Sequence, residues 1–475
     1  MKNKILVFII TLLILVFGIS RYLNHRTYYS IDNNRQFIRA EDGRITILHG
    51  MNILTNAKAH PLRIGELNKE DITRLSSEWG FNAVRLLIFW DGIEAEKGKY
   101  DYEYLDRVKE RLDWCEEAGL KVILDMHQDL YAVDFGGDGA PKWAIEDDGA
   151  EFEKQLPWEL NYFEDAVQNS IANFWEKDNG HPELQEHFIN SLLVAVRYLA
   201  NHPSVIGIDL YNEPTHATLH GFFNLEEKYL TPFYQEIINK IREFNSDIWI
   251  YYEPQAFGPN QGFKSKLGLL NDPRKGDSRL VYFPHIYTLD LDINGEYMDD
   301  SFYIDMWANA RQEEYQRQNV PMLIGEFGLK VDSTLSLKFI DEVANMMDKT
   351  GSGWFYWGYD PSNWSIIDTN KVTTISQKVL ERPYPMYIAG DKPIFSWDLN
   401  TEVFLFKANW NKALEEKLTN NTTEIYMPDF VWKDGFDINV LEGKIDSEYN
   451  KEKRKLIVKP VGYGNFSFEI IPTKK

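Results

Sequence analysis

The sequence is poor in cysteine and in positive charge, and both shortages exclude classes of protein. Its 475 residues include one cysteine, Cys115, which excludes an intramolecular disulfide and a cysteine-ligated zinc site. Lysine and arginine number 51 against 73 aspartate and glutamate residues, so the net charge is −22. Because nucleic-acid backbones require a basic protein surface, we expect no nucleic-acid partner. Nothing in the sequence implies a protein partner.

Internal repeats, low-complexity tracts and the usual metal-binding spacings are also missing. The sequence has no H-x-H and no H-E-x-x-H motif. A divalent ion could in principle be gathered by His127, Asp129, Glu213, His285 and Glu326, and this remains a competing chemistry. We expect neither a metal nor another cofactor.

Residues 1–29 form a basic and then apolar N-terminal segment. Lys2 and Lys4 precede the apolar run Ile5–Ile19, which has 15 residues. That length suits a secretory signal and falls short of the roughly 20 residues of a spanning helix. A cleaved signal, an uncleaved anchor and a segment buried in the fold remain open. The first two predict a secreted or extracytoplasmic membrane-anchored protein, with possible contact to a membrane surface.

Residues 30–383 alternate apolar, β-branched runs with amphipathic segments, a pattern typical of a (β/α)8 TIM barrel. The predicted strands are Ile45–Asn52, Asn82–Phe89, Lys121–His127, Val205–Glu213, Ile248–Glu253, Leu280–Ile286, Pro321–Phe327 and Gly353–Trp357. The predicted helices include Tyr104–Ala118, Leu184–Ala200, Leu225–Phe244, Tyr303–Gln316 and Leu335–Asp348. Before them, the segment Gln36–Ile47 predicts a hairpin that turns at Asp42-Gly43 and closes the barrel floor.

Residues 384–475 have a different sequence pattern, in which short runs of alternating apolar and polar residues are separated by glycine and proline. The predicted strands are Ile394–Asp398, Val403–Lys407, Thr423–Met427, Ile438–Leu441, Lys455–Lys459 and Asn465–Ile471. This pattern predicts a small C-terminal β-sandwich domain. The expected fold class is therefore α/β, a TIM barrel followed by a β-sandwich.

Polar or aromatic groups stand at the C-terminal ends of seven predicted barrel strands. They are Arg85, His127, Asn212 with Glu213, Glu253, His285 with Tyr287, Glu326 and Trp357. Because a barrel gathers these strand ends around one pocket, we expect them to share a single site.

Two of these groups are the carboxylates that glycosidic bond cleavage needs on either side of an acetal. Glu213 ends the fourth strand and Glu326 the seventh. We expect Glu326 to be the nucleophile, kept ionised by donors such as Arg85 and the Tyr287 hydroxyl. Glu213 is then the acid/base, whose proton is retained partly by the field of Glu326. Asn212 is expected to donate to the sugar 2-hydroxyl.

Each of these residues also has a purely structural interpretation. Glu213 and Glu326 could be ion-pair partners, and Arg85 could be a barrel salt bridge. His127 and Trp357 could belong to the core. The sequence alone leaves these alternatives open.

The strand-end motifs resemble those of glycoside hydrolase family 5 over roughly residues 33–383. The motifs are Val84-Arg85, Met126-His127, Leu210-Tyr211-Asn212-Glu213-Pro214, His285-Ile286-Tyr287, Gly325-Glu326-Phe327-Gly328 and Trp357. The resemblance implies a retaining glycosidase that uses Glu213 and Glu326.

A finer resemblance is to the endoglycoceramidases, which cut the bond between a glycan and ceramide. It is carried by Asp125-Met126-His127-Gln128-Asp129, Tyr131, Gly137-Asp138-Gly139-Ala140-Pro141 and Trp143. The same resemblance implies that Lys58 and Asp129 contact sugar hydroxyls, although the stretch Met51–Pro61 departs from the family pattern. The long insertion of about residues 128–182 is rich in aromatic residues, and it could form either an apolar wall for a lipid or a self-packing lid.

The sequence therefore favours a retaining endo-type β-glycosidase acting on a glycolipid. A family 5 β-glucanase or β-mannanase acting on a polysaccharide is the first alternative. A surface carbohydrate-binding protein without turnover is the second. The retaining mechanism predicts that the carboxyl groups of Glu213 and Glu326 lie about 5 Å apart.

Overall fold

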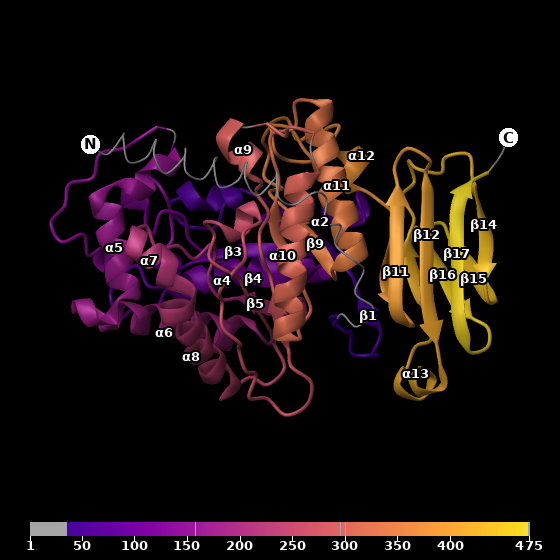
Figure 1. Ribbon diagram of the computed structural model, residues 1–475, viewed down its shortest axis with the longest axis horizontal. Helices are drawn as coiled ribbons and strands as arrows, with labels where there is room; N and C mark the ends of the chain where they lie inside the picture. The colour runs from indigo at the N-terminus through magenta and orange to yellow at the C-terminus, as the bar shows by residue number, and fades with distance from the viewer. Residues whose placement is uncertain (1–35, 157, 295, 300, 474–475) are drawn as a thin grey trace.

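The computed structural model describes residues 36–156, 158–294, 296–299 and 301–473 of the chain. They form a barrel and, beside it, a unit of antiparallel strands (Figure 1). The expected signal or anchor at residues 1–29 lies outside the described residues. The secreted or membrane-anchored localisation inferred from it therefore stays a prediction. Within the described part of the chain, no helix is both long and apolar enough to cross a bilayer.

Eight parallel strands form the barrel, in the order β7-β6-β5-β4-β3-β2-β9-β8. They are β2 (Leu48–Ile53), β3 (Ala83–Phe89), β4 (Lys121–His127), β5 (Val205–Asp209), β6 (Trp249–Tyr252), β7 (Leu280–Tyr282), β8 (Ile324–Phe327) and β9 (Gly353–Tyr356). Parallel bridges from Tyr282 to Met322 and from Ile286 to Phe327 join the two edge strands. The sheet is thereby closed, which confirms the predicted (β/α)8 architecture.

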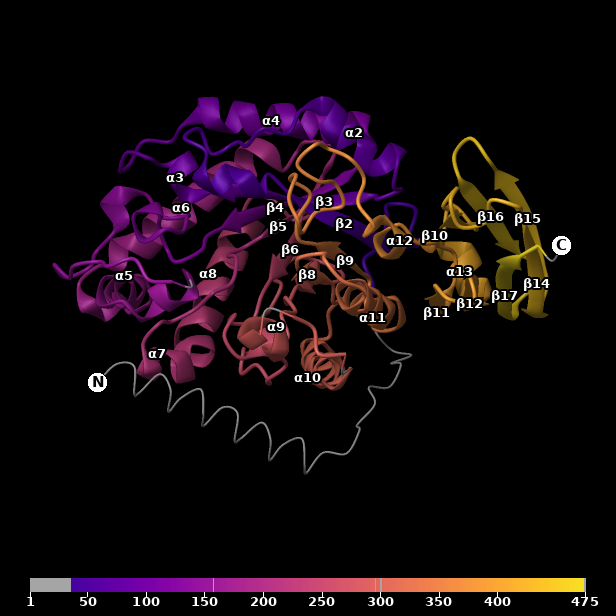
Figure 2. The ribbon, with the colours of Figure 1, turned by 90° about the horizontal axis from the view of Figure 1, so that it is seen from above.

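Helices surround the strands, as the view from above shows (Figure 2). The longer ones are α2 (Lys69–Ser77), α4 (Tyr102–Glu117), α5 (Asp165–Trp175), α6 (Pro182–Leu199), α8 (Thr231–Arg242), α10 (Phe302–Gln318) and α11 (Thr334–Thr350). The short ones are α3 (Trp90–Ile93), α7 (Leu219–Asn224), α9 (Leu289–Asn294), α12 (Gln377–Leu380) and α13 (Lys412–Lys417). Local sequence sets several boundaries, since Asn68 and Asp71 form a reciprocal capping box at α2 and Asp101 caps α4.

Single turns of 3-10 helix and one π-helical segment complete the barrel loops. They are η1 (Thr55–Ala59), η2 (Val133–Phe135), η3 (Lys142–Ala144), η4 (Trp158–Phe163), η5 (Lys177–Asn179), η6 (Leu225–Leu230, the π-helix) and η7 (Pro259–Gln261). The predicted helix Leu225–Phe244 is thus a π-helical turn followed by α8. The insertion after β4 contains α5 and several of these turns.

The first predicted strand, Ile45–Asn52, is divided between the two units. Its beginning, β1 (Ile45–Thr46), pairs antiparallel with β10 (Tyr384–Ile388) of the C-terminal unit. Its continuation, β2, joins the barrel. The predicted hairpin is present as a bridge between Arg39 and Ile45, and Ile38 packs in the barrel's interior cluster, so the expected floor is confirmed.

The C-terminal unit consists of two antiparallel sheets around a core of its own, and it confirms the predicted β-sandwich. The sheet order is β1-β10-β13-β16-β15 in one layer and β11-β12-β17-β14 in the other. The remaining strands are β11 (Asp391–Asp398), β12 (Val403–Trp410), β13 (Thr423–Tyr426), β14 (Phe436–Glu442), β15 (Ile445–Asn450), β16 (Lys455–Pro460) and β17 (Gly464–Pro472). Two strands, β10 and β15, were not predicted.

Alternation along the barrel strands divides its interior into an apolar and a polar layer. The interior cluster includes Ala83, Ile123, Tyr251, Phe283 and Phe355. Because side chains on a strand repeat their direction every second residue, the residues two positions further point to the same interior. They are Arg85, Asp125, Glu253, His285 and Trp357. The apolar layer therefore supports a polar layer at the C-terminal ends of the strands.

Polar contacts, some exposed and some buried, join the barrel and the sandwich. Arg454 of the sandwich donates to the carbonyl oxygens of Ser76, Ser77 and Glu78 at the end of α2, where a helix favours a cation. Below the barrel, His49 stacks between Trp354 and Tyr384. Its Nε2 lies 3.2 Å from Asp348, which also lies 3.2 Å from the fully buried Arg382.

We expect Asp348→Asn to lower the free energy of unfolding by about 3 kcal/mol, because it removes the charge facing the buried guanidinium of Arg382. Equilibrium urea denaturation measures the change. Glu416→Gln is the matched control, since Glu416 pairs with Lys412 on the exposed surface and should not shift the midpoint. Equal midpoints for the two variants would contradict the prediction.

Candidate active site

Arg85 occupies the centre of the polar layer and is completely buried. Its guanidinium contacts four carboxylates, those of Asp125 (2.9 Å), Asp209 (2.8 Å), Glu253 (3.1 Å) and Glu326 (2.6 Å). It also donates to the Oδ1 atoms of Asn52 and Asn212. Arg85 is therefore the barrel salt bridge that one interpretation expected, and it orients Glu326 as well.

Glu326 receives a donor on each carboxylate oxygen. Arg85 Nη1 donates to Oε1 at 2.6 Å, and the Tyr287 hydroxyl donates to Oε2 at 3.1 Å. The pKa of Glu326 lies above its ordinary value, because burial outweighs the opposite effect of the positive charges of His285 and Arg85. These contacts hold the carboxylate in one orientation.

Glu213 lies four residues beyond the end of β5, rather than in the strand as predicted. Its backbone φ is +45°, which is an uncommon conformation for a residue with a side chain. His285 Nδ1 and Asn260 Nδ2 both lie 2.9 Å from its Oε1. Since both contacts involve Oε1, Oε2 is the oxygen that can carry a transferable proton.

Glu213 and Glu326 belong to the same site. One carboxylate oxygen of each lies within 4.8 Å of the other and of His285. The side chain of Glu213 is 20% exposed and that of Glu326 is 5% exposed. This spacing agrees with the short distance between the two carboxyl groups of retaining glycosidases. Of the two side chains, Glu213 is the one that solvent reaches more easily.

Asn212 is held directly beside Glu213. Its Nδ2 donates to the Gln128 carbonyl oxygen, and Gln128 Nε2 donates back to the Asn212 carbonyl oxygen. An amide nitrogen carries two hydrogens, so Asn212 retains one for another acceptor.

A second part of the site lies around Lys58. Its ammonium group donates to Asp129 and lies 4.4 Å from the centre of the Trp357 ring. Burial lowers the pKa of Lys58, but the charges of Asp129, Asp138 and Glu326 outweigh it, and the pKa lies above its ordinary value. Lys58 is therefore a cation in the site.

His127 connects the two parts. Its Nδ1 lies 2.6 Å from Asp125, a partner of Arg85, and its Nε2 lies 3.7 Å from Asp129. Its ring stacks on that of Trp357 with 5.5 Å between centroids. Burial and the charge of Lys58 hold the pKa of His127 well below its usual value, so the imidazole is neutral.

All ten residues proposed for the site from the sequence thus lie in one connected set. Glu253, which was expected among the strand-end groups without a role, lies in the same set. Further members were not proposed for the site, namely Asp125, Gln128, Asp138, Asp209 and Asn260. Asp125 follows the same two-residue alternation as Arg85, and this pattern could have identified it. Asn260 lies in η7, a loop segment that carries no pattern pointing to Glu213.

The aromatic insertion after β4 divides into a packed and an exposed group. Tyr131, Phe135, Tyr162, Phe174 and Trp175 are buried against one another and the barrel, as a self-packing segment requires. The exposed large apolar residues of the insertion are Val133, Leu156, Trp158 and Phe163, and Leu219 and Phe223 are exposed on α7. Gln168 of α5 donates to the Ala217 carbonyl oxygen, which joins the insertion to the start of α7.

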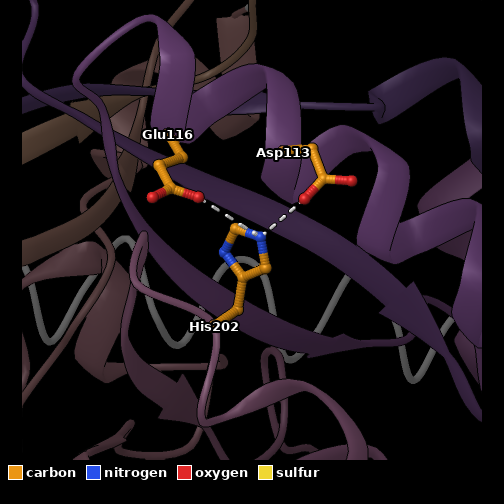
Figure 3. Close-up of side chains that lie close together, drawn as sticks. All are labelled: Asp113, Glu116 and His202. Atoms are coloured by element: carbon orange, nitrogen blue, oxygen red, sulfur yellow. Dashed lines mark hydrogen bonds and ion pairs between the residues drawn. The ribbon is translucent and has the colours of Figure 1, made fainter.

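Three clusters among the described residues bring three possible metal-ligand atoms within 4.8 Å of one another. Two of them, His127-Asp129-Asp138 and Glu213-His285-Glu326, lie beside Lys58 and Arg85, and these cations compete with a metal for the carboxylates. Figure 3 shows the third, in which His202 lies 2.9 Å from Asp113 and 3.7 Å from Glu116 of α4. Both carboxylates are at least half exposed, as is usual for a surface ion pair.

Two family models match the chain. The cellulase model of glycosyl hydrolase family 5 matches residues 41–363. The glycoside hydrolase family 5 C-terminal domain matches residues 382–464. Together they cover the barrel and the sandwich.

Among curated proteins, endoglycoceramidase I of Rhodococcus hoagii is 27% identical over 428 residues, which are 85% of this chain and 81% of that one. The solved structure of endo-glycoceramidase II from Rhodococcus sp. in complex with ganglioside GM3 is 33% identical. It has a TM-score of 0.84 and covers 93% of this chain and 100% of its own. Another structure of that enzyme, described as a lactosyl-enzyme intermediate, is 32% identical, with a TM-score of 0.83 and coverage of 92% and 100%. The barrel, its paired glutamates and these matches agree, and the chain belongs to glycoside hydrolase family 5.

Proposed function

We propose that this glycosidase is a retaining endo-type enzyme that hydrolyses the linkage between the glycan and the ceramide of glycosphingolipids. The observation that carries the proposal is the pair Glu213 and Glu326, whose carboxylate oxygens lie within 4.8 Å in one site. The substrate class is supported by relatives that are named endoglycoceramidases, one of which has been solved with ganglioside GM3.

In the first step, Glu326 attacks the anomeric carbon while Glu213 donates a proton to the leaving oxygen of ceramide. Arg85 and Tyr287 keep the attacking carboxylate oriented through its two oxygens. A covalent glycosyl-enzyme follows, and the lactosyl-enzyme intermediate of the Rhodococcus enzyme supports this step by analogy. Glu213 then removes a proton from water, which attacks the anomeric carbon and releases the glycan.

The sugar side of the site is the part around Lys58. Lys58 and Asp129 offer a cation and a carboxylate for sugar hydroxyls, and Trp357 offers an aromatic face. Neutral His127 can donate or accept a hydrogen bond there, and Asn212 has a free amide hydrogen for the 2-hydroxyl. Binding of this kind suits a neutral sugar near the cleavage point.

The ceramide side requires apolar surface close to Glu213. Leu219 and Phe223 lie on α7, shortly after Glu213 in the chain, and are 66% and 59% exposed. Exposed apolar groups of this size favour contact with a lipid or a membrane surface. They support an aglycone wall on the acid/base side of the site.

A polysaccharide is the alternative substrate, because the barrel matches a model described as cellulase. We expect the protein to hydrolyse a glycosylceramide in detergent micelles and to leave a soluble β-glucan intact. The sugar should be released first as the β-anomer, since double displacement retains configuration. Product analysis with proton NMR measures both results. Turnover of the glucan alone would rule out the lipid substrate, and release of the α-anomer would rule out the retaining mechanism.

We expect Glu326→Gln to reduce kcat/KM by about three orders of magnitude or more with an unchanged fold, because the amide cannot act as nucleophile. Glu213→Gln should reduce kcat/KM for glycosylceramide by a comparable factor. It should be much less impaired on a 2,4-dinitrophenyl β-lactoside, whose leaving group departs without a proton. Asp332→Asn, an exposed position five residues beyond the end of β8, is the control and should retain activity. Full activity of Glu326→Gln would remove Glu326 from the mechanism.

We expect the double variant Leu219→Ser/Phe223→Ser to lower kcat/KM for glycosylceramide in vesicles by about tenfold or more, through lost apolar contact. Hydrolysis of a soluble aryl β-lactoside should be unchanged. Leu441→Ser serves as the matched control, because Leu441 is 50% exposed but lies on the sandwich strand β14. Equal losses on both substrates would argue against a lipid-binding role for α7.

A further inference from the structure

Glu253 is a buried carboxylate next to both catalytic glutamates, and the mechanism above does not use it. It directly follows β6 and lies two residues after Tyr251 of the apolar interior layer. Its exposure is 2%. A buried carboxylate is expensive unless it is well paired, so its contacts indicate what it does.

Each oxygen of Glu253 faces donors. Oε1 lies 3.1 Å from Arg85 Nη2 and 3.2 Å from His285 Nε2. Oε2 accepts a hydrogen bond of 3.0 Å from the backbone N–H of Glu213. Burial raises the pKa of Glu253 to about 8, although the positive charges of His285 and Arg85 oppose that effect. All three groups that face its two oxygens are nonetheless donors. The contacts are those of a carboxylate.

The bond from the Glu213 amide holds a strained backbone. The φ of +45° at Glu213 is unfavourable for a residue with a side chain, and it persists only where the surroundings enforce it. Glu253 Oε2 fixes the amide on the N-terminal side of Glu213, and Gln128 Nε2 donates to its carbonyl oxygen on the other side. The direction of the Glu213 side chain depends on this clamp.

The ion pair with His285 extends the influence of Glu253 to the reacting atoms. While Nε2 of His285 faces Glu253, its Nδ1 lies 2.9 Å from Glu213 Oε1 and 3.7 Å from Glu326 Oε2. Burial lowers the pKa of His285, but Glu253 and Glu326 outweigh it and hold the pKa well above its ordinary value. The ring is therefore an imidazolium between the two catalytic glutamates.

We infer that Glu253 is a positioning residue of the glycosidic reaction, which clamps the backbone of Glu213 and keeps His285 charged between Glu213 and Glu326. This rests on the roles proposed for those two glutamates. A plain structural role, as one more partner of Arg85, is the competing explanation.

The charged groups around Glu253 determine how the pKa values of His285 and Glu326 change when the charge of Glu253 is removed. Arg85 of β3 and His285 after β7 face it with positive charge. Asp125 of β4 and Asp209 of β5 face it with negative charge. Tyr234 of α8 packs nearby. Losing the Glu253 charge lowers the pKa of His285, because one of the carboxylates that raise it is gone. An uncharged His285 no longer lowers the pKa of Glu326, so the pKa of Glu326 rises.

The test is Glu253→Gln, which preserves shape and an acceptor for the Glu213 amide but removes the charge. We expect the acid limb of the kcat/KM profile, which reports ionisation of Glu326, to move to higher pH by about one unit. We also expect kcat/KM for phenyl β-lactoside to fall by about tenfold or more, with a smaller loss for the 2,4-dinitrophenyl β-lactoside. Soluble lactosides keep the test independent of the lipid substrate.

Glu226→Gln is the matched control, because Glu226 is equally buried and accepts bonds from the backbone of Gln255 and Lys266 without contacting either catalytic glutamate. It should lower the melting temperature and leave the acid limb in place. An acid limb unmoved in Glu253→Gln, at any level of activity, overturns the inference.

A measurement on the unaltered protein covers the case in which Glu253→Gln does not fold. With 15N-labelled histidine, and His285→Gln to assign the signals, both ring nitrogens of His285 should be protonated at neutral pH. A neutral ring at that pH would likewise overturn the inference.

Discussion

The guanidinium of Arg85 is the group on which the other polar contacts of the site depend. It is fully buried and holds Asp125, Asp209, Glu253 and Glu326 around one positive charge. Without it, these carboxylates would repel one another in a medium of low dielectric constant. Through Asp125 it also reaches His127, so the glutamates and the part around Lys58 share one scaffold. The same interaction both stabilises the barrel interior and orients the nucleophile.

A layer of apolar residues lies beneath Arg85 in the barrel interior. The interior cluster below Arg85 includes Ile38 from the N-terminal hairpin, which excludes water from the floor. The same hairpin leads into β1, which belongs to the sandwich. The C-terminal unit is thus connected to the underside of the barrel, opposite the strand ends that form the site.

Two groups of residues suit the two parts of a glycolipid. Lys58, Asp129 and Trp357 provide charge and an aromatic face for a sugar. Helix α7, which follows Glu213 in the chain, exposes Leu219 and Phe223. Many other aromatic residues of the insertion are buried, because Phe174 and Trp175 pack with Tyr211 and Phe233 rather than facing solvent. The apolar wall is therefore smaller than the aromatic content of the insertion indicates.

The sequence by itself determined the barrel, the sandwich and eight of the ten proposed site residues, because apolar runs and strand-end motifs are local patterns. Lys58 and Asp129 came from the family resemblance. The sequence could not determine that Ile45–Asn52 serves two sheets, since the partner strand β10 lies more than 300 residues further along the chain. It also did not indicate that Asn260 contacts Glu213, or that Glu253 contacts both the Glu213 backbone and His285. These contacts join loops and strand ends that meet only when the sheet closes, so tertiary structure alone decided them. The closed barrel also decided the protonation of His285, because burial and carboxylates from separate strands act on it together.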